Sequence, residues 1–113
     1  MLDIQTTGRG KITVAVRGEL DLRNAPALRA AITALLNRGD VTAIDLDLGA
    51  VTSADPSGLG TVIVAHRIAA GVGVGLRLTE VSPLTGRLLQ LLGADELVPA
   101  QRRAERIPQA TLL

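Results

Sequence analysis

The sequence contains no cysteine, phenylalanine, tyrosine or tryptophan among its 113 residues. The lack of cysteine excludes disulfides, thiolate catalysis and cysteine-ligated metals. The lack of aromatic side chains excludes stacking on nucleic-acid bases, and the core must be built from leucine, isoleucine, valine and alanine. The single histidine, His66, makes a histidine-rich metal site implausible. We therefore expect neither a metal nor any other cofactor.

Net charge and long apolar runs are also scarce. The formal net charge is +1 at pH 7, which gives no strong electrostatic attraction to nucleic acid. No segment approaches the roughly 18 consecutive apolar residues of a membrane span, and the N-terminus lacks the apolar core of a secretory signal. Hydrophobic residues make up 47 % of the chain, which favours a folded globular protein. These features predict a single cytoplasmic domain over residues 1–113, without membrane insertion.

Alternating apolar and polar residues predict four strands. Each has one apolar set of side chains and one polar set, which is typical of a sheet with one face on the core and the other partly in water. The expected strands cover residues 2–6, 12–17, 43–48 and 74–79, and residues 96–100 can add a fifth at an edge. The first two strands are expected to form a hairpin, because residues 8–10 between them, Gly-Arg-Gly, are typical of a turn.

Apolar residues at helical spacing predict three helices after these strands. Their expected caps are Asn24, Asp55 and Ser82, each followed by a proline that suits a first helical turn. The expected buried stripes are Leu28, Ala31, Ile32, Leu35 and Leu36 in the first helix, Leu59, Val62, Ile63 and Ala70 in the second, and Leu84, Leu88, Leu91 and Leu92 in the third. The arginine-rich residues 101–107 are expected to form a last helix.

The order of these elements predicts the fold class. A strand-helix-strand-helix-strand order implies right-handed crossovers and some parallel pairing. The polar second face of each strand argues against helices on both sides of the sheet. We therefore predict an α/β fold with a mixed β-sheet of four to five strands and helices mainly on one face.

Several polar residues have the right side chains for chemistry but lack its spacing. His66 lies on or near an apolar helix stripe, without a serine or carboxylate in a triad relation. Asp45 and Asp47 share one strand face, which is more often solvated than used as an acid/base pair. The run GVGVG at residues 71–75 closes a helix, whereas a dinucleotide-binding loop opens one. We therefore do not expect an enzyme.

Residues 52–60, TSADPSGLG, allow two interpretations. Asp55 and Pro56 are a favourable helix start. Gly58 and Gly60 then fall in the first turns of the helix, where each costs about 1 kcal/mol relative to alanine. Bare backbone at these positions gives another protein surface close access, and it equally permits tight packing against a neighbouring strand. The residues alone favour neither interpretation.

The ordered motifs resemble those of the STAS domain family, and more narrowly those of bacterial anti-sigma factor antagonists. "GELDL" leads into a helix, "IDLDLGAVTSADPSGLG" joins a strand to the next helix, and "VSPLTGRLLQLLG" follows. The resemblance covers essentially residues 2–100 and implies a STAS-like mixed sheet with helices mainly on one side. It also implies a partner, because in that family the domain binds an anti-sigma factor, often a serine kinase, and so frees a sigma factor for RNA polymerase.

The resemblance further implies a partner-binding site and a phosphorylation switch. The site residues that it implies are Asp21, Asn24, Asp55, Pro56, Ser57, Gly58 and Gly60. In the family, the kinase phosphorylates the hydroxyl residue directly after the motif aspartate. Pro56 occupies that position here and has no hydroxyl. We therefore expect the usual switch to be absent or rerouted, with Ser57 as the remaining, slow candidate for phosphorylation.

Two other functions stay open. The motifs also resemble small STAS proteins that serve as accessory subunits of ABC-type lipid-transport ATPases and dock through the same helix start. Glycines at a helix N-terminus suit, in addition, a sensor domain for nucleotides or other small ligands. The sequence leaves the oligomeric state open.

Overall fold

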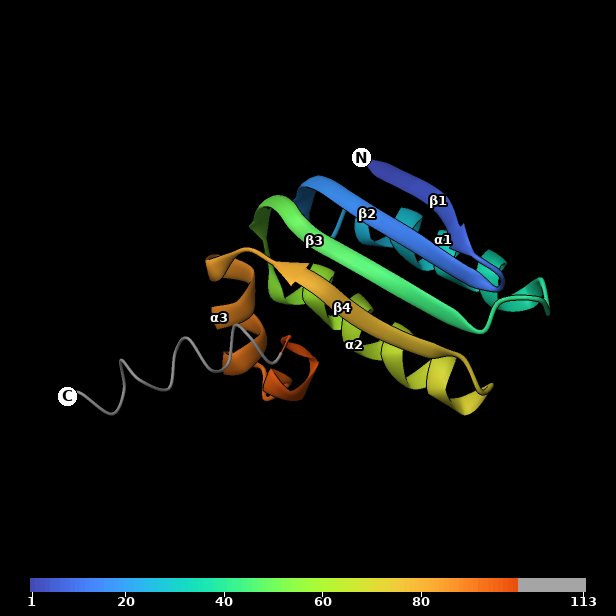
Figure 1. The fold of residues 1–113 in the computed structure, drawn as a ribbon. Helices are drawn as coiled ribbons and strands as arrows, with labels where there is room; N and C mark the ends of the chain where they lie inside the picture. The colour runs from blue at the N-terminus through green and yellow to red at the C-terminus, as the bar shows by residue number, and fades with distance from the viewer. Residues whose placement is uncertain (100–113) are drawn as a thin grey trace.

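The computed structural model describes residues 1–99, apart from the side chain of Asp95. Four strands form one sheet in the order β1-β2-β3-β4: β1 is Leu2–Gly8, β2 is Lys11–Leu20, β3 is Ala43–Ala54 and β4 is Gly75–Val81. The helices are α1 (Ala25–Asn37), α2 (Pro56–Gly71) and α3 (Pro83–Leu91), followed by the short 3-10 helix η1 (Asp95–Leu97). In Figure 1, α1 and α2 lie behind the sheet, and α3 lies beside the end of β4.

The strand pairing confirms the predicted mixed sheet. β1 and β2 form the expected antiparallel hairpin. The other two pairs are parallel, with Ile12 opposite Ile44 and Leu46 opposite Leu78. Parallel neighbours require crossover connections, which α1 and α2 provide on the same face of the sheet (Figure 1). The predicted α/β fold with helices mainly on one face is therefore confirmed.

The core lies between the sheet and the helices, and all of its largest side chains are aliphatic. The apolar residues of each central strand point toward α1 and α2, so that Val14 and Leu46 are fully buried. The opposite face of the sheet is polar. The largest fully buried side chains are Leu20, Leu28, Ile32, Ile44, Leu46, Leu48, Leu59, Leu89, Val14, Val16, Val62 and Val81. Within residues 1–99, no helix has both the length and the apolar character needed to span a membrane.

Two of the three expected helix caps are formed. The Asp55 carboxylate accepts from the N–H of Gly58, and the Ser82 hydroxyl accepts from the N–H of Thr85. Asn24 occupies the cap position of α1, but its side chain makes no capping bond. Its backbone is already helical, with φ −96° and ψ −19°, whereas a capping residue normally needs an extended backbone to turn its side chain toward the helix. The expectation that Asn24 caps α1 through its side chain is therefore wrong.

The predicted buried stripe of α3 is wrong except for Leu88, which packs against the core. The helix instead turns Thr85, Gly86 and Leu89 toward the core. Gly86 packs against the end of β4, where a β-carbon would lie 3.5 Å from Cγ2 of Val81, an ordinary van der Waals distance. Of the four leucines in the predicted stripe, three are exposed and one is half-buried: Leu84, Leu91 and Leu92 are exposed, and Leu88 is half-buried.

Three smaller expectations are corrected. β3 ends at Ala54 and not at residue 48, because its second half still pairs with β2. In α2, Ala70 is exposed and Ala69 is buried, because Ala69 continues the helical spacing of Val62 and Ala65.

The third correction concerns the possible fifth strand at residues 96–100. The described part of this segment begins within the 3-10 helix η1, and its residues Leu97 and Val98 pack into the core. The sheet of the described residues therefore has four strands. The helix expected at residues 101–107 lies outside the described residues.

Candidate functional site

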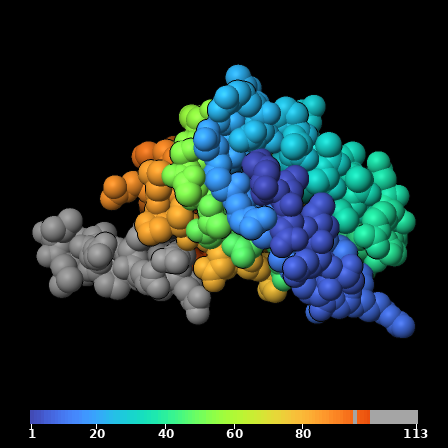
Figure 2. Space-filling model, turned by 90° about the horizontal axis from the view of Figure 1, so that it is seen from above, coloured from blue at the N-terminus to red at the C-terminus, as the bar shows by residue number. Residues whose placement is uncertain are grey.

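The carboxyl ends of β2 and β3 bring two chain segments together. One is the β2–α1 loop, residues 21–24, and the other is the junction between β3 and α2. The N–H of Asp55 in that junction donates to the carbonyl oxygen of Leu20 at 3.2 Å. In Figure 2 the light-blue atoms near residue 20 lie beside the green atoms that lead into α2. The two segments therefore form one continuous surface.

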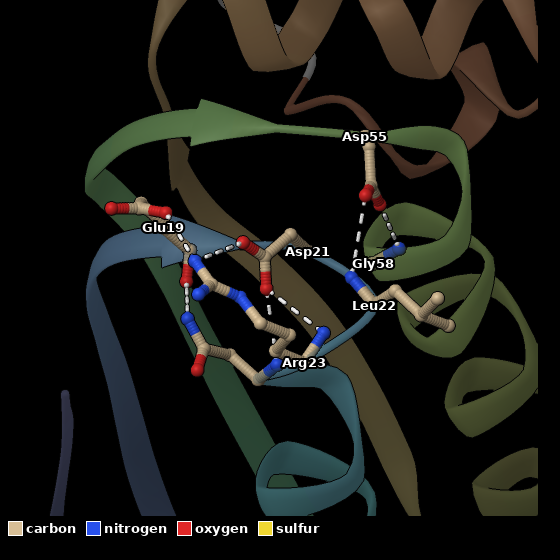
Figure 3. A network of polar contacts seen from close by, with 7 residues as sticks. Glu19, Asp21, Leu22, Arg23, Asp55 and Gly58 are labelled. Atoms are coloured by element: carbon tan, nitrogen blue, oxygen red, sulfur yellow. Dashed lines mark hydrogen bonds and ion pairs between the residues drawn. The ribbon is translucent and has the colours of Figure 1, made fainter.

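The Asp55 carboxylate bonds to both segments (Figure 3). Oδ1 accepts from the N–H of Gly58 at 2.7 Å and caps α2. Oδ2 accepts from the N–H of Leu22 at 3.3 Å and holds the β2–α1 loop. A negative charge at this place also interacts favourably with the positive end of the helix dipole. One side chain therefore starts α2 and fixes the neighbouring loop.

Asp21 organises the rest of the loop. Its Oδ1 accepts from the N–H groups of Arg23 and Asn24, directly before α1, at 3.0 and 3.1 Å. The guanidinium of Arg23 lies 3.5 Å from Asp21 and 3.4 Å from Glu19. Desolvation raises the pKa of Asp21. The two N–H groups and the Arg23 charge lower the pKa by more than this, so that it lies below its ordinary value. Asp21 is therefore ionised at neutral pH.

Asn24 lies in the same loop and bonds back to the strand. Its Nδ2 donates to the carbonyl oxygen of Glu19 at 2.9 Å. The side chain is half-buried. Asn24 therefore joins the loop to the end of β2 and stabilises the loop conformation.

The two glycines at the start of α2 have different environments. A β-carbon at Gly58 would overlap the carbonyl oxygen of Leu20 and lie 2.6 Å from its carbonyl carbon. Gly58 is therefore required by the close approach of α2 to the end of β2. A β-carbon at Gly60 would meet no described atom within 4 Å. Packing among residues 1–99 thus gives no reason for glycine at position 60, although it lowers the stability of the helix.

Pro56 and Ser57 are the exposed first residues of α2. Proline suits the first helical position, because the N–H that it lacks has no partner within the helix. Leu22, which the sequence analysis did not select, is 69 % exposed. The signal that identifies it is a large apolar residue within a short polar loop, directly after the motif aspartate Asp21.

The other polar candidates are engaged elsewhere. Asp45 forms an ion pair with Arg77, with 2.8 Å between Oδ1 and Nε, and this hydrogen bond together with the Asp45 charge raises the pKa of Arg77. Asp47 accepts from the N–H of Gly49 at 2.8 Å. His66 is half-buried on α2. Within residues 1–99, no group of three or more histidine, aspartate or glutamate side chains is placed to hold a metal ion.

Comparison with known proteins yields consistent matches. A family model described as "Mlab, STAS domain" matches residues 5–99. An anti-sigma F factor antagonist from Paenibacillus polymyxa is 28 % identical over 91 residues, which cover 80 % of this chain and 78 % of that protein. The solved structure of an anti-sigma factor antagonist from Mycobacterium paratuberculosis is 29 % identical, with a TM-score of 0.74 over 88 % of this chain and 82 % of that one.

A further match concerns the fold alone. The structure of the unphosphorylated anti-sigma factor antagonist SpoIIAA has a TM-score of 0.75 at 22 % identity, and the match covers 96 % of this chain and 97 % of that one. The family model spans most of the sequence, and the sheet and helices match the SpoIIAA fold. The chain therefore belongs to the STAS domain family, and it is similar to the anti-sigma factor antagonists in that family.

Proposed function

We propose that this chain is an anti-sigma factor antagonist that binds an anti-sigma factor of the serine-kinase type. The contact region is the loop–helix surface, which we define as Asp21, Leu22, Pro56, Ser57 and Gly60. The relatives at 28 % and 29 % identity, both named antagonists, support this function over an ABC-transporter subunit or a ligand sensor. Under this proposal the chain acts by binding in the cytoplasm and catalyses no reaction.

Gly60 is the observation that carries the proposal. It reduces the stability of α2 by about 1 kcal/mol relative to alanine, and nothing within 4 Å in the described chain requires it. A partner whose surface closely approaches the backbone at the start of α2 accounts for this glycine. The hydrogen bonds of Asp55 hold that surface in one shape before binding, which reduces the ordering cost of association.

A binding experiment with matched variants tests the proposal. The chain is immobilised and exposed to a lysate of its source cell, and retained proteins are identified by mass spectrometry. We expect an anti-sigma factor to be retained by the wild type and by Gly71→Arg, but not by Gly60→Arg. Both glycines lie in α2 with no described atom within 4 Å of an added β-carbon. We therefore expect both variants to fold, which far-UV circular dichroism checks, and only one carries a bulky side chain on the loop–helix surface.

Other outcomes of this experiment contradict the proposal. Retention of an ABC-type ATPase in place of an anti-sigma factor would favour the transporter-subunit function. Retention of neither, together with a rise in melting temperature on addition of GTP or ATP, would favour the sensor function. Equal retention by Gly60→Arg and Gly71→Arg would remove the loop–helix surface as the contact region.

We propose in addition that Pro56 removes the usual phosphorylation switch. A phosphate would add about −1.5 to −2 charges at neutral pH to the loop–helix surface, where it would repel acidic groups of a partner and obstruct the fit. Pro56 offers no hydroxyl to accept it, and its place at the first helical position makes it favourable for the fold. The antagonist would then bind its partner without this form of control.

Pro56→Ser is expected to create a phosphate acceptor. Serine at the first helical position leaves the Asp55 cap intact, because that bond goes to the N–H of Gly58. With the retained kinase and ATP, we expect about one phosphate per chain in Pro56→Ser. The wild type is expected to incorporate none, or to be modified slowly at Ser57. Intact-mass spectrometry measures the phosphate content of Pro56→Ser and of the wild type. Ser57→Ala is the control, because it removes the slow site of the wild type. Rapid full modification of the wild type would contradict the prediction.

A further inference from the structure

Leu22 is a large apolar side chain held in solvent on the loop–helix surface. It is 69 % exposed, and it lies between the ionised Asp21 and the exposed Arg23. A single exposed leucine needs no special explanation on most surfaces. Leu22 differs from most of them because two carboxylates fix the backbone that carries it.

The backbone at Leu22 is held by one carboxylate from its own loop and one from the β3–α2 junction. Its own N–H donates to Oδ2 of Asp55 at 3.3 Å. The next N–H along the chain, that of Arg23, donates to Oδ1 of Asp21 at 3.0 Å. In Figure 3 the Leu22 side chain points away from the cluster of Glu19, Asp21 and Arg23. The residue is therefore held in place without a covering group from that cluster.

An ordered and exposed apolar side chain is well suited to recognition. Binding energy at protein interfaces is concentrated in a few residues that enter well-packed pockets of the partner. Such residues contribute more when their backbone is ordered before association, since less conformational freedom is then lost. The bonds from Asp21 and Asp55 provide that order at Leu22.

The charges around Leu22 indicate the chemistry of its partner. Glu19, Asp21 and Asp55 contribute three carboxylates near the loop, and Arg23 contributes one guanidinium. The backbone that carries Leu22 therefore lies beside more negative than positive charge, while the leucine side chain itself points away from Glu19, Asp21 and Arg23. A complementary surface would present an apolar pocket bordered by lysine or arginine side chains.

We infer that Leu22 is the main apolar contact of the loop–helix surface, and that Asp55 is a positioning residue that holds it. The occupant is the anti-sigma factor, which receives Leu22 in an apolar pocket with a basic border. This inference rests on the proposed function and adds to it the residue and the partner chemistry on which affinity depends.

Titration of the anti-sigma factor retained by the wild type tests the role of Leu22. Leu22→Ala is expected to weaken binding about 30-fold, which corresponds to about 2 kcal/mol at 1.4 kcal/mol per tenfold. The control is Leu91→Ala on α3, where the leucine is 76 % exposed, and its dissociation constant should stay within about twofold of the wild-type value. Both substitutions remove an exposed side chain, so that far-UV circular dichroism should show two folded proteins.

Asp55→Asn separates positioning from a general effect on the fold. Asparagine is as good a helix cap as aspartate, but its side chain has one acceptor oxygen and cannot serve Gly58 and Leu22 together. We expect Asp55→Asn to keep α2 and to weaken binding about five- to tenfold in the wild-type background. In the Leu22→Ala background it should cause no further loss, because the side chain that it positions is absent.

Three results would overturn parts of this inference. If the wild type and Leu22→Ala bind equally well, Leu22 is not the main contact, while the proposed function stands. If the losses of Leu22→Ala and Asp55→Asn multiply in the double variant, Asp55 does not act through Leu22. If the wild type binds no anti-sigma factor, the proposed function fails and this inference fails with it.

Discussion

Gly58→Ala is expected to lower the free energy of unfolding by about 3 kcal/mol, at the upper end of the usual cost of overpacking. The added methyl group would overlap the carbonyl oxygen of Leu20. The obstacle is backbone at the end of a central strand, so that no side-chain rotation relieves it. The first turn of α2 must then move away from β2, and the hydrogen bond between Asp55 N–H and Leu20 is weakened with it.

Urea titration followed by far-UV circular dichroism measures this loss, since the chain has no tryptophan for fluorescence. Gly60→Ala is the matched control two residues further along α2, where an added β-carbon meets no described atom within 4 Å. It should stabilise the isolated protein by about 0.5–1 kcal/mol through helix propensity. Equal effects at the two positions, in either direction, would contradict the structure at the start of α2.

Asp55→Ala is expected to lower the free energy of unfolding by about 2 kcal/mol. Loss of the cap on α2 costs about 1 kcal/mol, and loss of the bond to the N–H of Leu22 adds roughly 1 kcal/mol. The β2–α1 loop then loses its connection to α2. A lower urea midpoint with an unchanged m-value would indicate a change of stability alone.

Asp55→Asn divides this loss into its two parts. The amide oxygen can retain the bond to Gly58 but cannot also accept from Leu22. We therefore expect this variant to lose about 1 kcal/mol, half of the loss in Asp55→Ala. If Asp55→Asn is as unstable as Asp55→Ala, the charge of the carboxylate and not its number of acceptors determines stability here.

The parts of the fold that follow local rules were predictable from the sequence. The hairpin follows from alternation around a glycine-rich turn, and the starts of α2 and α3 follow from a capping residue before a proline, at Asp55 and Ser82. The crossovers follow from the order of the elements, which leaves few arrangements for a parallel sheet. The turn and cap signals lie within a few residues of the structure that they specify, and the crossovers need only the order of the elements.

The parts that depend on distant neighbours were not predictable. The buried face of α3 depends on Val81 and Val98, which lie next to Gly86 only in the folded chain. Leucines on the other face of that helix gave a stronger periodic signal than the small residues that pack. Gly58 and Gly60 look alike in the sequence, and only the carbonyl of Leu20 distinguishes them. For Leu22 the missing information was exposure, which a sequence with 47 % hydrophobic residues does not reveal.

The parallel pairing of β2 with β3 has a consequence for how the chain folds during synthesis. Residues 21–42 lie between the end of β2 and the start of β3, so that this whole segment must leave the ribosome before the partner strand of β2 begins to emerge. Until then the β1–β2 hairpin carries Val14 and Val16 without the cover that buries them completely in the finished domain. Loop closure over such distances slows folding compared with local contacts. Transiently exposed apolar surface of this kind favours aggregation, and the parallel pairing of β2 with β3 prolongs its exposure on the nascent hairpin.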